Sequence, residues 1–151
     1  MILYVDASAI VAIVGNEAAS TVVEATLDRD GVIAVVSDLA IAESSAALAR
    51  NGRLRQWSHV ETDRFYRDLD IWVSDAAEAV SIGPADVGQA TDFVRQDGIA
   101  LRAPDAIHIA AAHRLGATLL TLNKGMARAA AALGVSYLYP AEADSPGETK
   151  D

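Results

Sequence analysis

Short apolar runs alternate with longer segments of helical period along this chain. Runs rich in Val, Ile and Leu occupy residues 2–5, 32–36, 117–121 and 135–138, a composition typical of strands buried on both faces. The segments between them carry apolar residues three and four positions apart, as amphipathic helices do. This alternation predicts an α/β fold in which a parallel sheet is covered by helices.

Capping residues predict where two of the helices begin and end. Asn16 is placed to cap a helix that runs to about Leu27. Ser37 or Asp38 is placed to cap a second helix, which we expect to end near residues 51–52, Asn-Gly.

Proline and glycine mark two later helices. Pro84 and Pro104 suit first helical turns, while Gly116 and Gly134 stand where C-terminal glycines belong. The segment 55–72 is also expected to be helical, with a less regular pattern. The helix after Pro84 keeps four residues on one face: Val87, Ala90, Thr91 and Val94.

Length and composition favour one globular domain. The chain has 151 residues and is 52% hydrophobic, enough for a sizeable core, and we expect the domain to span residues 1–140. Residues 141–151 are acidic, small and polar, which predicts a disordered tail. The formal net charge of -9 speaks against a protein that grips nucleic acid over its whole surface.

Several classes are excluded by what the sequence lacks. Without cysteine there is no disulfide, thiolate metal site or cysteine nucleophile. The longest stretch free of charged residues, between Arg128 and Glu142, is shorter than the roughly 18 residues of a membrane span. No basic segment precedes the first acid, Asp6, so we expect no secretory signal and a cytoplasmic protein.

Three acids stand where a site could form. Asp6 directly follows the first apolar run, with Ser8 two positions on, and ligands bind at the carboxyl ends of parallel strands. Glu43 borders the apolar stripe of its helix, and Asp105 lies in a first turn after Pro104. Each also has a structural explanation: a helix cap for Asp6 or Ser8, a solvated side chain for Glu43, and the helix dipole for Asp105.

The combination of the three acids points to a cation. Converging carboxylates about 4 Å apart repel one another by roughly 4 kcal/mol per pair at an effective dielectric of 20, and a metal ion would relieve this. Oxygen ligands without cysteine favour Mg²⁺ or Mn²⁺. His108, one turn after Asp105, is more simply a packed helix residue than a ligand.

The order of the motifs resembles PIN-domain proteins of the VapC toxin type. The motifs are Tyr4-Val5-Asp6-Ala7-Ser8-Ala9, the helix that carries Glu43, Pro104-Asp105-Ala106-Ile107-His108-Ile109-Ala110, and Leu120-Thr121-Leu122-Asn123. The resemblance implies a three-layer α/β/α domain with a mainly parallel sheet. It also implies a metal-dependent endoribonuclease that is often dimeric and is held inactive by an antitoxin encoded beside it. Asp6, Glu43 and Asp105 match the acidic positions of the family.

The resemblance implies hydrolysis of RNA phosphodiesters by metal-activated water. Asp6, Glu43 and Asp105 would hold Mg²⁺, directly or through water, and Ser8 and Asn123 would orient the ion or its waters. The family usually has an aspartate where this chain has Asn123. Asparagine removes one charge, but it can bind through its carbonyl or cap the helix that begins at Lys124.

Basic residues gather in one segment. This segment holds five arginines and only two acids, Glu61 and Asp63, a local excess of three positive charges. The arginines are Arg50, Arg53, Arg55, Arg64 and Arg67. They are candidates for phosphate contacts, or simply a solvated helix face. The aromatic residues among them, Trp57, Phe65 and Tyr66, suit base stacking, core packing or a dimer interface. Arg102 is a candidate contact for substrate or for an antitoxin carboxylate.

Two other function classes stay open. One is a catalytically weak or silent PIN-like module that binds RNA or protein. The asparagine at position 123, where the family usually has an aspartate, leaves this class open. The other is a phosphoacceptor or phosphatase-like domain that uses Asp6. The phosphatase pattern would want a second aspartate where this chain has Ser8, and a receiver domain would want an acid pair that residues 1–5 do not supply.

Overall fold

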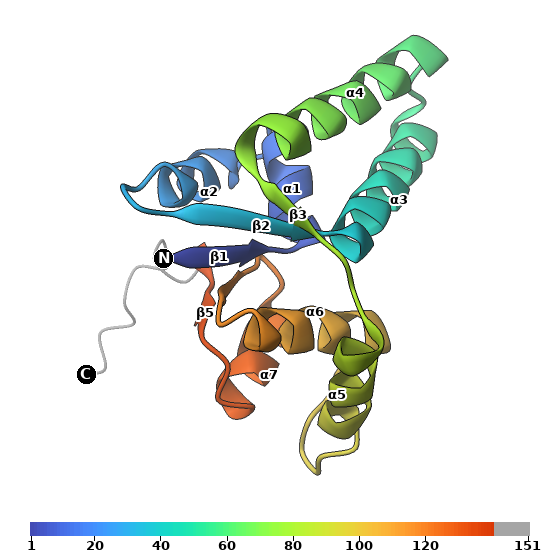
Figure 1. The fold of residues 1–151 in the computed structure, drawn as a ribbon. Helices are drawn as coiled ribbons and strands as arrows, with labels where there is room; N and C mark the ends of the chain where they lie inside the picture. The colour runs from blue at the N-terminus through green and yellow to red at the C-terminus, as the bar shows by residue number, and fades with distance from the viewer. Residues whose placement is uncertain (141–151) are drawn as a thin grey trace, which may run out of the picture.

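A five-stranded sheet forms the centre of the molecule (Figure 1). The computed structural model describes residues 1–140, so the expected tail at 141–151 lies outside the described residues. The strand order is β3-β2-β1-β4-β5, and every neighbouring pair is parallel. The strands are β1 (Ile2–Val5), β2 (Ile33–Ser37), β3 (Glu78–Val80), β4 (Thr118–Leu120) and β5 (Tyr137–Leu138). The predicted parallel α/β sheet is confirmed.

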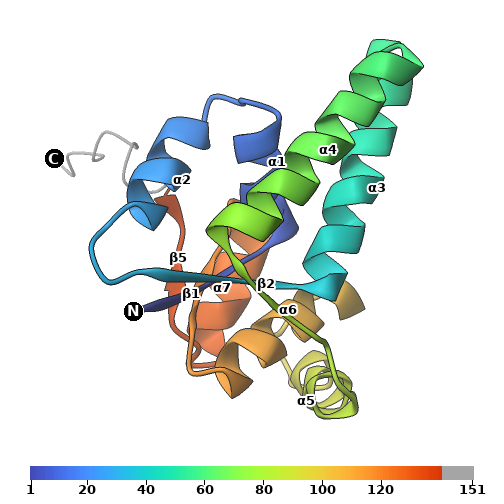
Figure 2. The same cartoon turned by 45° about the horizontal axis from the view of Figure 1, so that its top comes forward.

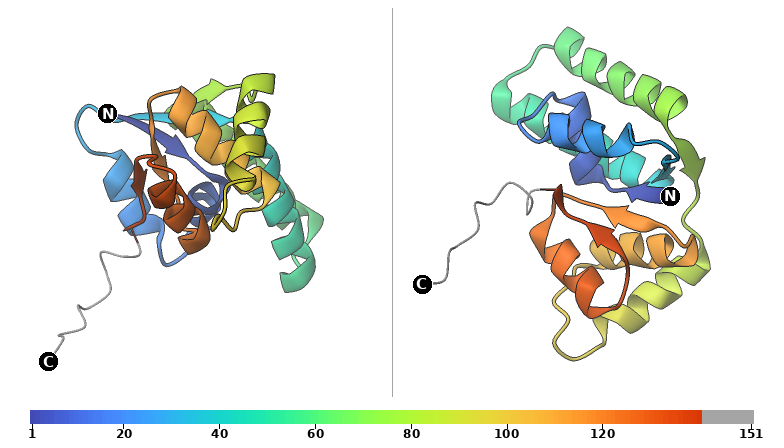
Figure 3. Two further views of the ribbon diagram at one scale, coloured as in Figure 1. Left: turned by 90° about the horizontal axis from the view of Figure 1, so that it is seen from below. Right: turned by 90° about the vertical axis from the view of Figure 1, so that its left-hand side faces the viewer.

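Helices cover both faces of this sheet (Figures 1 and 3). On one side lie α1 (Ala7–Val14), α2 (Ser20–Leu27), α3 (Asp38–Arg55) and α4 (His59–Ala76). On the other lie α5 (Pro84–Val94), α6 (Ala103–Arg114) and α7 (Lys124–Ala132). The three-layer arrangement is therefore as expected. None of these helices is long and apolar enough to cross a membrane.

The central strand β1 divides its side chains between two cores. Leu3 and Val5 belong to the core beneath α1–α4, while Tyr4 faces the core beneath α5–α7. All three side chains are fully buried. The alternation of a strand thus places Tyr4 on the side of the sheet where α6 packs.

The order of the strands reverses beside β1. The chain passes from β1 outward through β2 and β3, then returns to the other side of β1 with β4 and β5. Ligands in open parallel sheets bind where the order reverses in this way, outside the carboxyl ends of the strands. Asp6 follows β1 and Thr121 follows β4, so these two residues stand at the reversal point.

One strand is missing from the sequence prediction. β3 has only three residues, all at least partly exposed, and it pairs with β2 at the edge of the sheet. An exposed three-residue edge strand needs no buried apolar run, and the hydrophobic pattern therefore gave no signal for it.

Asn16 does not cap α2, so that prediction is wrong. Its backbone is left-handed, with φ of 48°, a conformation that asparagine tolerates better than most residues. The helix begins only at Ser20 and has Ala19 as its N-terminal flanking residue. Asn16 serves the turn between α1 and α2 instead.

The predicted end of α3 at residues 51–52 is also wrong. The helix continues to Arg55 and ends at Gln56, which is left-handed. Gly52 lies inside the helix, where α4 packs against it. A Cβ added to Gly52 would lie 3.1 Å from the Thr62 Oγ1. Ser58 then opens α4, and the two helices form the long hairpin of Figure 2.

The buried face of α5 is rotated from the expected one. Asp86, Ala90 and Phe93 are buried, whereas Val87 and Val94 are 48% and 38% exposed. Asp86 forms an ion pair with Arg114 of α6, and this pair accounts for a charged residue on the inner face of α5.

Candidate active site

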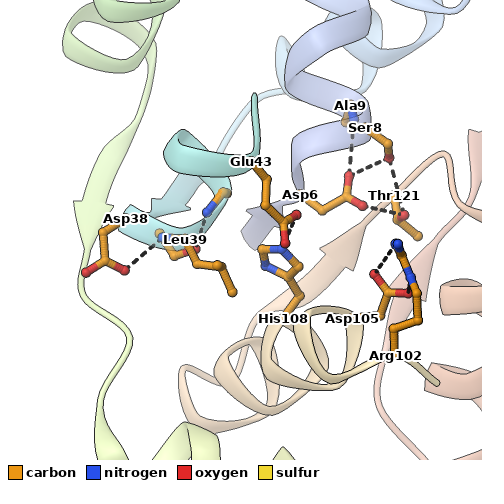
Figure 4. A network of polar contacts seen from close by, with 12 residues as sticks. Asp6, Ser8, Ala9, Asp38, Leu39, Glu43, Arg102, Asp105, His108 and Thr121 are labelled. Atoms are coloured by element: carbon orange, nitrogen blue, oxygen red, sulfur yellow. Dashed lines mark hydrogen bonds and ion pairs between the residues drawn. The ribbon is translucent and has the colours of Figure 1, made fainter. Parts of the chain in front are cut away.

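Asp6 is buried and firmly held at the end of β1 (Figure 4). Its Oδ1 accepts hydrogen bonds from the Ser8 hydroxyl at 2.7 Å and from the Ala9 backbone N–H at 3.1 Å. Its Oδ2 accepts a hydrogen bond from the Thr121 hydroxyl at 2.7 Å. Asp6 therefore caps α1, as one of the two explanations for this residue predicted. Its carboxylate also lies at the carboxyl end of the central strand β1.

Burial raises the pKa of the Asp6 carboxyl above its ordinary value. The hydrogen bonds from Ser8, Thr121 and Ala9 act in the opposite direction and do not fully offset the loss of hydration. A cation beside this carboxylate would stabilise its charged form.

Thr121 and Ser8 join the two chain segments that meet at the site. The Ser8 hydroxyl oxygen accepts a hydrogen bond from the Leu122 backbone N–H at 2.9 Å, and that of Thr121 accepts one from the Asn123 N–H at 3.0 Å. Sequence reasoning missed the role of Thr121. Its position directly after β4, the strand paired with β1, was the available signal.

Glu43 points from α3 into the same region, with its side chain about one-third exposed. Its Oε2 lies 3.0 Å from the Nε2 of His108. Among residues 1–140 no other hydrogen bond holds this carboxylate, so its second oxygen stays available for a ligand.

His108 is fully buried and connects Glu43 to the protein interior. Its Nδ1 lies 2.7 Å from the Tyr4 hydroxyl, which donates to the Ser37 Oγ at 2.6 Å. Burial raises the pKa of Tyr4, so the phenol stays neutral. The histidine is a packed helix residue, as the simpler reading expected, but one that contacts a candidate site residue.

Asp105 lies in the first turn of α6 and is largely buried. The guanidinium of Arg102 faces it, with Nε 3.3 Å from Oδ2 and Nη2 3.4 Å from Oδ1 (Figure 4). The Arg102 side chain is 78% exposed. These distances describe a loose ion pair at the rim of the site.

A cavity of about 410 Å³ brings all three predicted acids together. We call it the acidic cavity. Asp6, Glu43 and Asp105 line it, as do the expected supporting residues Ser8 and Asn123. Its remaining lining residues are Ala7, Val11, Glu17, Ala47, Arg50, Arg102, Leu122 and Met126. Four acids and two arginines therefore face one space, and Glu17 is an acid that sequence reasoning did not single out.

The donors in the acidic cavity fit a hard cation held partly through water. In residues 1–140, no three His, Cys, Asp or Glu side chains are arranged so that they could hold an ion directly. Glu43 is bonded to His108, and Asp105 is paired with Arg102. Mg²⁺ commonly keeps several waters and takes only one or two carboxylates, and the oxygen donors present suit that mode.

A model of the PIN domain family matches residues 3–132. The chain belongs to the PIN domain family. The resemblance drawn from the ordered motifs is thereby confirmed at the level of the family. No curated protein matches the sequence significantly.

Solved structures share the fold of this PIN domain at low sequence identity. VapBC2 from Rickettsia felis, bound to a DNA fragment from its promoter, is 16% identical with a TM-score of 0.71, covering 92% of this chain and 98% of that one. FitAcB from Neisseria gonorrhoeae is 19% identical with a TM-score of 0.68, covering 93% and 98%. VapC20 from Mycobacterium tuberculosis, a Sarcin-Ricin loop cleaving toxin, is 18% identical with a TM-score of 0.64, covering 84% and 94%.

Asn123 has a structural role in this PIN domain. Its Oδ1 accepts a hydrogen bond from the Met126 backbone N–H at 3.1 Å, which caps α7. Its side chain also lines the acidic cavity. The cap is thus observed, and a contact with a bound ion or its waters stays a prediction.

The arginines of the basic segment divide into two groups. Arg50 lines the acidic cavity, whereas Arg53 lines a second cavity of about 420 Å³ between α3 and α4. The guanidinium of Arg55 lies 5.8 Å from the centroid of the Trp57 ring. Trp57 stacks on Phe65, with centroids 4.3 Å apart, so these aromatic rings pack the tip of the hairpin. The structure places neither Arg53 nor Arg55 among the residues that line the acidic cavity.

Proposed function

We propose that this PIN domain is a Mg²⁺-dependent endoribonuclease, the toxin of a toxin–antitoxin system. One observation carries the proposal: Asp6, Glu43 and Asp105, from three separate parts of the chain, line one cavity together with Arg50 and Arg102. Acids suit a divalent cation, and arginines beside them suit the phosphates that such a cation would help to cleave.

The solved structures add support from their own descriptions. VapC20 is a toxin that cleaves the Sarcin-Ricin loop, and VapBC2 binds a DNA fragment of its own promoter. Their identity to this chain is below 20%, so they show a shared fold. The activity itself rests on the residues of the acidic cavity.

Asp6, Glu43 and Asp105 would hold Mg²⁺, with Mn²⁺ as a possible substitute, directly or through water. When bound, the ion lowers the pKa of a water molecule and neutralises charge that builds on the phosphate. The three hydrogen bonds to Asp6 keep its carboxylate in place, which preorganises one side of the site.

The remaining residues have supporting tasks. Ser8 and Asn123 would orient water molecules, because both are polar and line the cavity. Arg50 and Arg102 would bind RNA phosphates. Arg102 can exchange Asp105 for a phosphate because its guanidinium is exposed and its ion pair is long.

The partners in this proposal are an RNA substrate, a cognate antitoxin and a second copy of the chain. An antitoxin carboxylate could reach Arg102, which stands exposed at the rim of the cavity. The homodimer rests on the family resemblance alone.

The other two function classes have less support. A phosphatase-like role would need a second aspartate where this chain has Ser8, and a receiver domain would need an acid pair that residues 1–5 do not supply. A silent binding module would keep the cavity but show no metal-dependent cleavage. The first experiment therefore measures cleavage.

The test is a Mg²⁺ titration with cleavage of RNA as the readout. We expect wild-type cleavage that EDTA abolishes. Asp6→Asn, Glu43→Gln and Asp105→Asn should each lower the rate by about 100-fold or more while the protein stays folded.

Asp92→Asn is the matched control. It removes one exposed carboxylate from α5, outside the cavity lining, and should leave cleavage unchanged. Cleavage that persists in EDTA, or an Asp105→Asn variant as active as wild type, would contradict the proposed site. Absence of cleavage with any tested RNA would favour the silent module.

A further inference from the structure

We infer that His108 is a positioning residue for Glu43. A buried chain of contacts runs from Ser37 through Tyr4 and His108 to the Glu43 carboxylate at the cavity. Figure 4 shows its outer contact, between His108 and Glu43. This series of contacts fixes the orientation of the Glu43 carboxylate beside the place of a bound ion. This inference rests on the proposed function, in which Glu43 helps to hold Mg²⁺.

The contacts that connect Ser37 to Glu43 are short, and the inner residues of this series are inaccessible to solvent. The distances are 2.6 Å from Tyr4 to Ser37, 2.7 Å from Tyr4 to His108 and 3.0 Å from His108 to Glu43. Ser37, Tyr4 and His108 are all 0% exposed. Ser37 in turn accepts a hydrogen bond from the Ala40 N–H at 3.0 Å, near the start of α3.

Every member comes from a different element. Tyr4 belongs to β1, Ser37 ends β2, His108 lies on α6 and Glu43 on α3. Packing fixes the Tyr4 and His108 rings, whose centroids are 5.7 Å apart. Because these rings cannot move freely, the imidazole presents its Nε2 at a fixed place, and Glu43 is the flexible member that this nitrogen orients.

A purely internal role for His108 explains only half of its contacts. A buried histidine needs partners for both ring nitrogens, and the interior supplies Tyr4 for one of them. The other partner is a carboxylate that is one-third exposed and lines the acidic cavity. The inner end of the chain is thus structural, while its outer end sets the geometry of a candidate site residue.

The spacing of residues along α6 explains how this helix both supplies Asp105 and contacts Glu43 through His108. His108 comes three residues after Asp105, so both side chains lie on the same face of the helix. Asp105 faces the acidic cavity itself, and His108 holds Glu43 from the neighbouring turn. Glu43 thus lines the cavity while its Oε2 is held by His108.

Two substitutions of His108 separate positioning from packing. A glutamine amide reaches toward the place of Nε2 and can still donate to Glu43, whereas an asparagine amide reaches only toward the place of Nδ1. We expect His108→Asn to weaken Mg²⁺ binding about 10- to 100-fold, measured by calorimetry with the metal alone. His108→Gln should recover most of that affinity.

Tyr4→Phe tests the inner link with little change in volume. It removes only the hydroxyl, and we expect a smaller loss of Mg²⁺ affinity than in His108→Asn. In the folded, metal-free protein, Glu43→Gln should also shift the NMR signal of the His108 Nε2, which reports the contact without any activity measurement.

The outcomes distinguish this inference from the proposed function. If folded His108→Asn and His108→Gln bind Mg²⁺ as tightly as wild type, the positioning role is overturned while the proposed function stands. Equal losses in both variants, in step with their melting temperatures, would also overturn it, because packing alone predicts them. If wild type binds no Mg²⁺, both fall together, and the failure is visible before any variant is made.

Discussion

The two ends of α6 each carry an arginine–aspartate pair, and the pairs differ in kind. At the C-terminal end, Arg114 binds Asp86 through Nε at 2.6 Å and Nη2 at 2.9 Å, and it also donates to the Ser81 carbonyl at 3.2 Å. At the N-terminal end, Arg102 approaches Asp105 only to 3.3 and 3.4 Å. Arg114 is 41% exposed and Arg102 78%.

The difference separates a fixed structural contact from an exchangeable one. The pair of Arg114 with Asp86 is short, bidentate and built on a buried carboxylate, so it holds α5 against α6. The pair of Arg102 with Asp105 is long, and its arginine faces solvent beside the acidic cavity. A carboxylate that is to receive a cation benefits from a partner that leaves easily.

Breaking the C-terminal pair should have the largest effect on stability. Arg114→Met leaves the Asp86 carboxylate buried without its charged partner, and we expect the free energy of unfolding to fall by roughly 2–3 kcal/mol. Urea denaturation measures this. Arg102→Met is the matched control and should change the same quantity by less than about 0.5 kcal/mol. Equal losses in the two variants would remove the distinction between the ends of α6.

The effect of Arg114→Met should depend on pH. Arg114 lowers the pKa of the Asp86 carboxyl below its ordinary value of 3.8. The stabilisation is therefore complete above that ordinary value and is lost as the pH falls through the lower folded value. We expect the difference between wild type and Arg114→Met to shrink below about pH 4 in urea denaturation. A constant difference from pH 7 to pH 3 would contradict this assignment.

Removing the loose pair should have a smaller effect, and it concerns binding. With RNA absent, Arg102→Met frees Asp105, so Mg²⁺ affinity should rise about two- to fivefold, the range of an exposed ion pair. Calorimetry with Mg²⁺ alone measures the change. Arg95→Met, on an exposed residue just after α5, is the control for loss of one positive charge. Weaker Mg²⁺ binding in Arg102→Met would show that the arginine supports the site in another way.

Much of the fold was predictable from local patterns. β1 is a run of four apolar residues that ends in an acid, and the positive φ of Gly116 and Gly134 appears where their positions after two helices predict it. The three acids were predictable as candidates because Asp6 follows a strand, Glu43 borders an apolar helix face and Asp105 lies in the first turn of a helix. That they line one cavity depends on the strand order, which periodicity does not contain.

Other features depend on contacts between distant segments. The inner face of α5 follows Asp86 because Arg114 lies 28 residues away in sequence and beside it in space. Gly52 is a typical helix terminator in sequence, yet it lies within α3, where a Cβ added to it would be 3.1 Å from the Thr62 Oγ1 of α4. His108 has a partner 65 residues earlier in Glu43 and another 104 residues earlier in Tyr4. No local pattern reports such pairs.

The hydrogen bond from Thr121 to Asp6 spans 115 residues, and it bears on when the surroundings of Asp6 are complete during synthesis. During synthesis Asp6 precedes β4 and Thr121 by more than a hundred residues. Until β4 emerges, β1 lacks one of its two neighbours and Asp6 lacks one of its three donors. The hydrogen bonds that hold Asp6 are therefore complete only after β4 has been made, late in the synthesis of the domain.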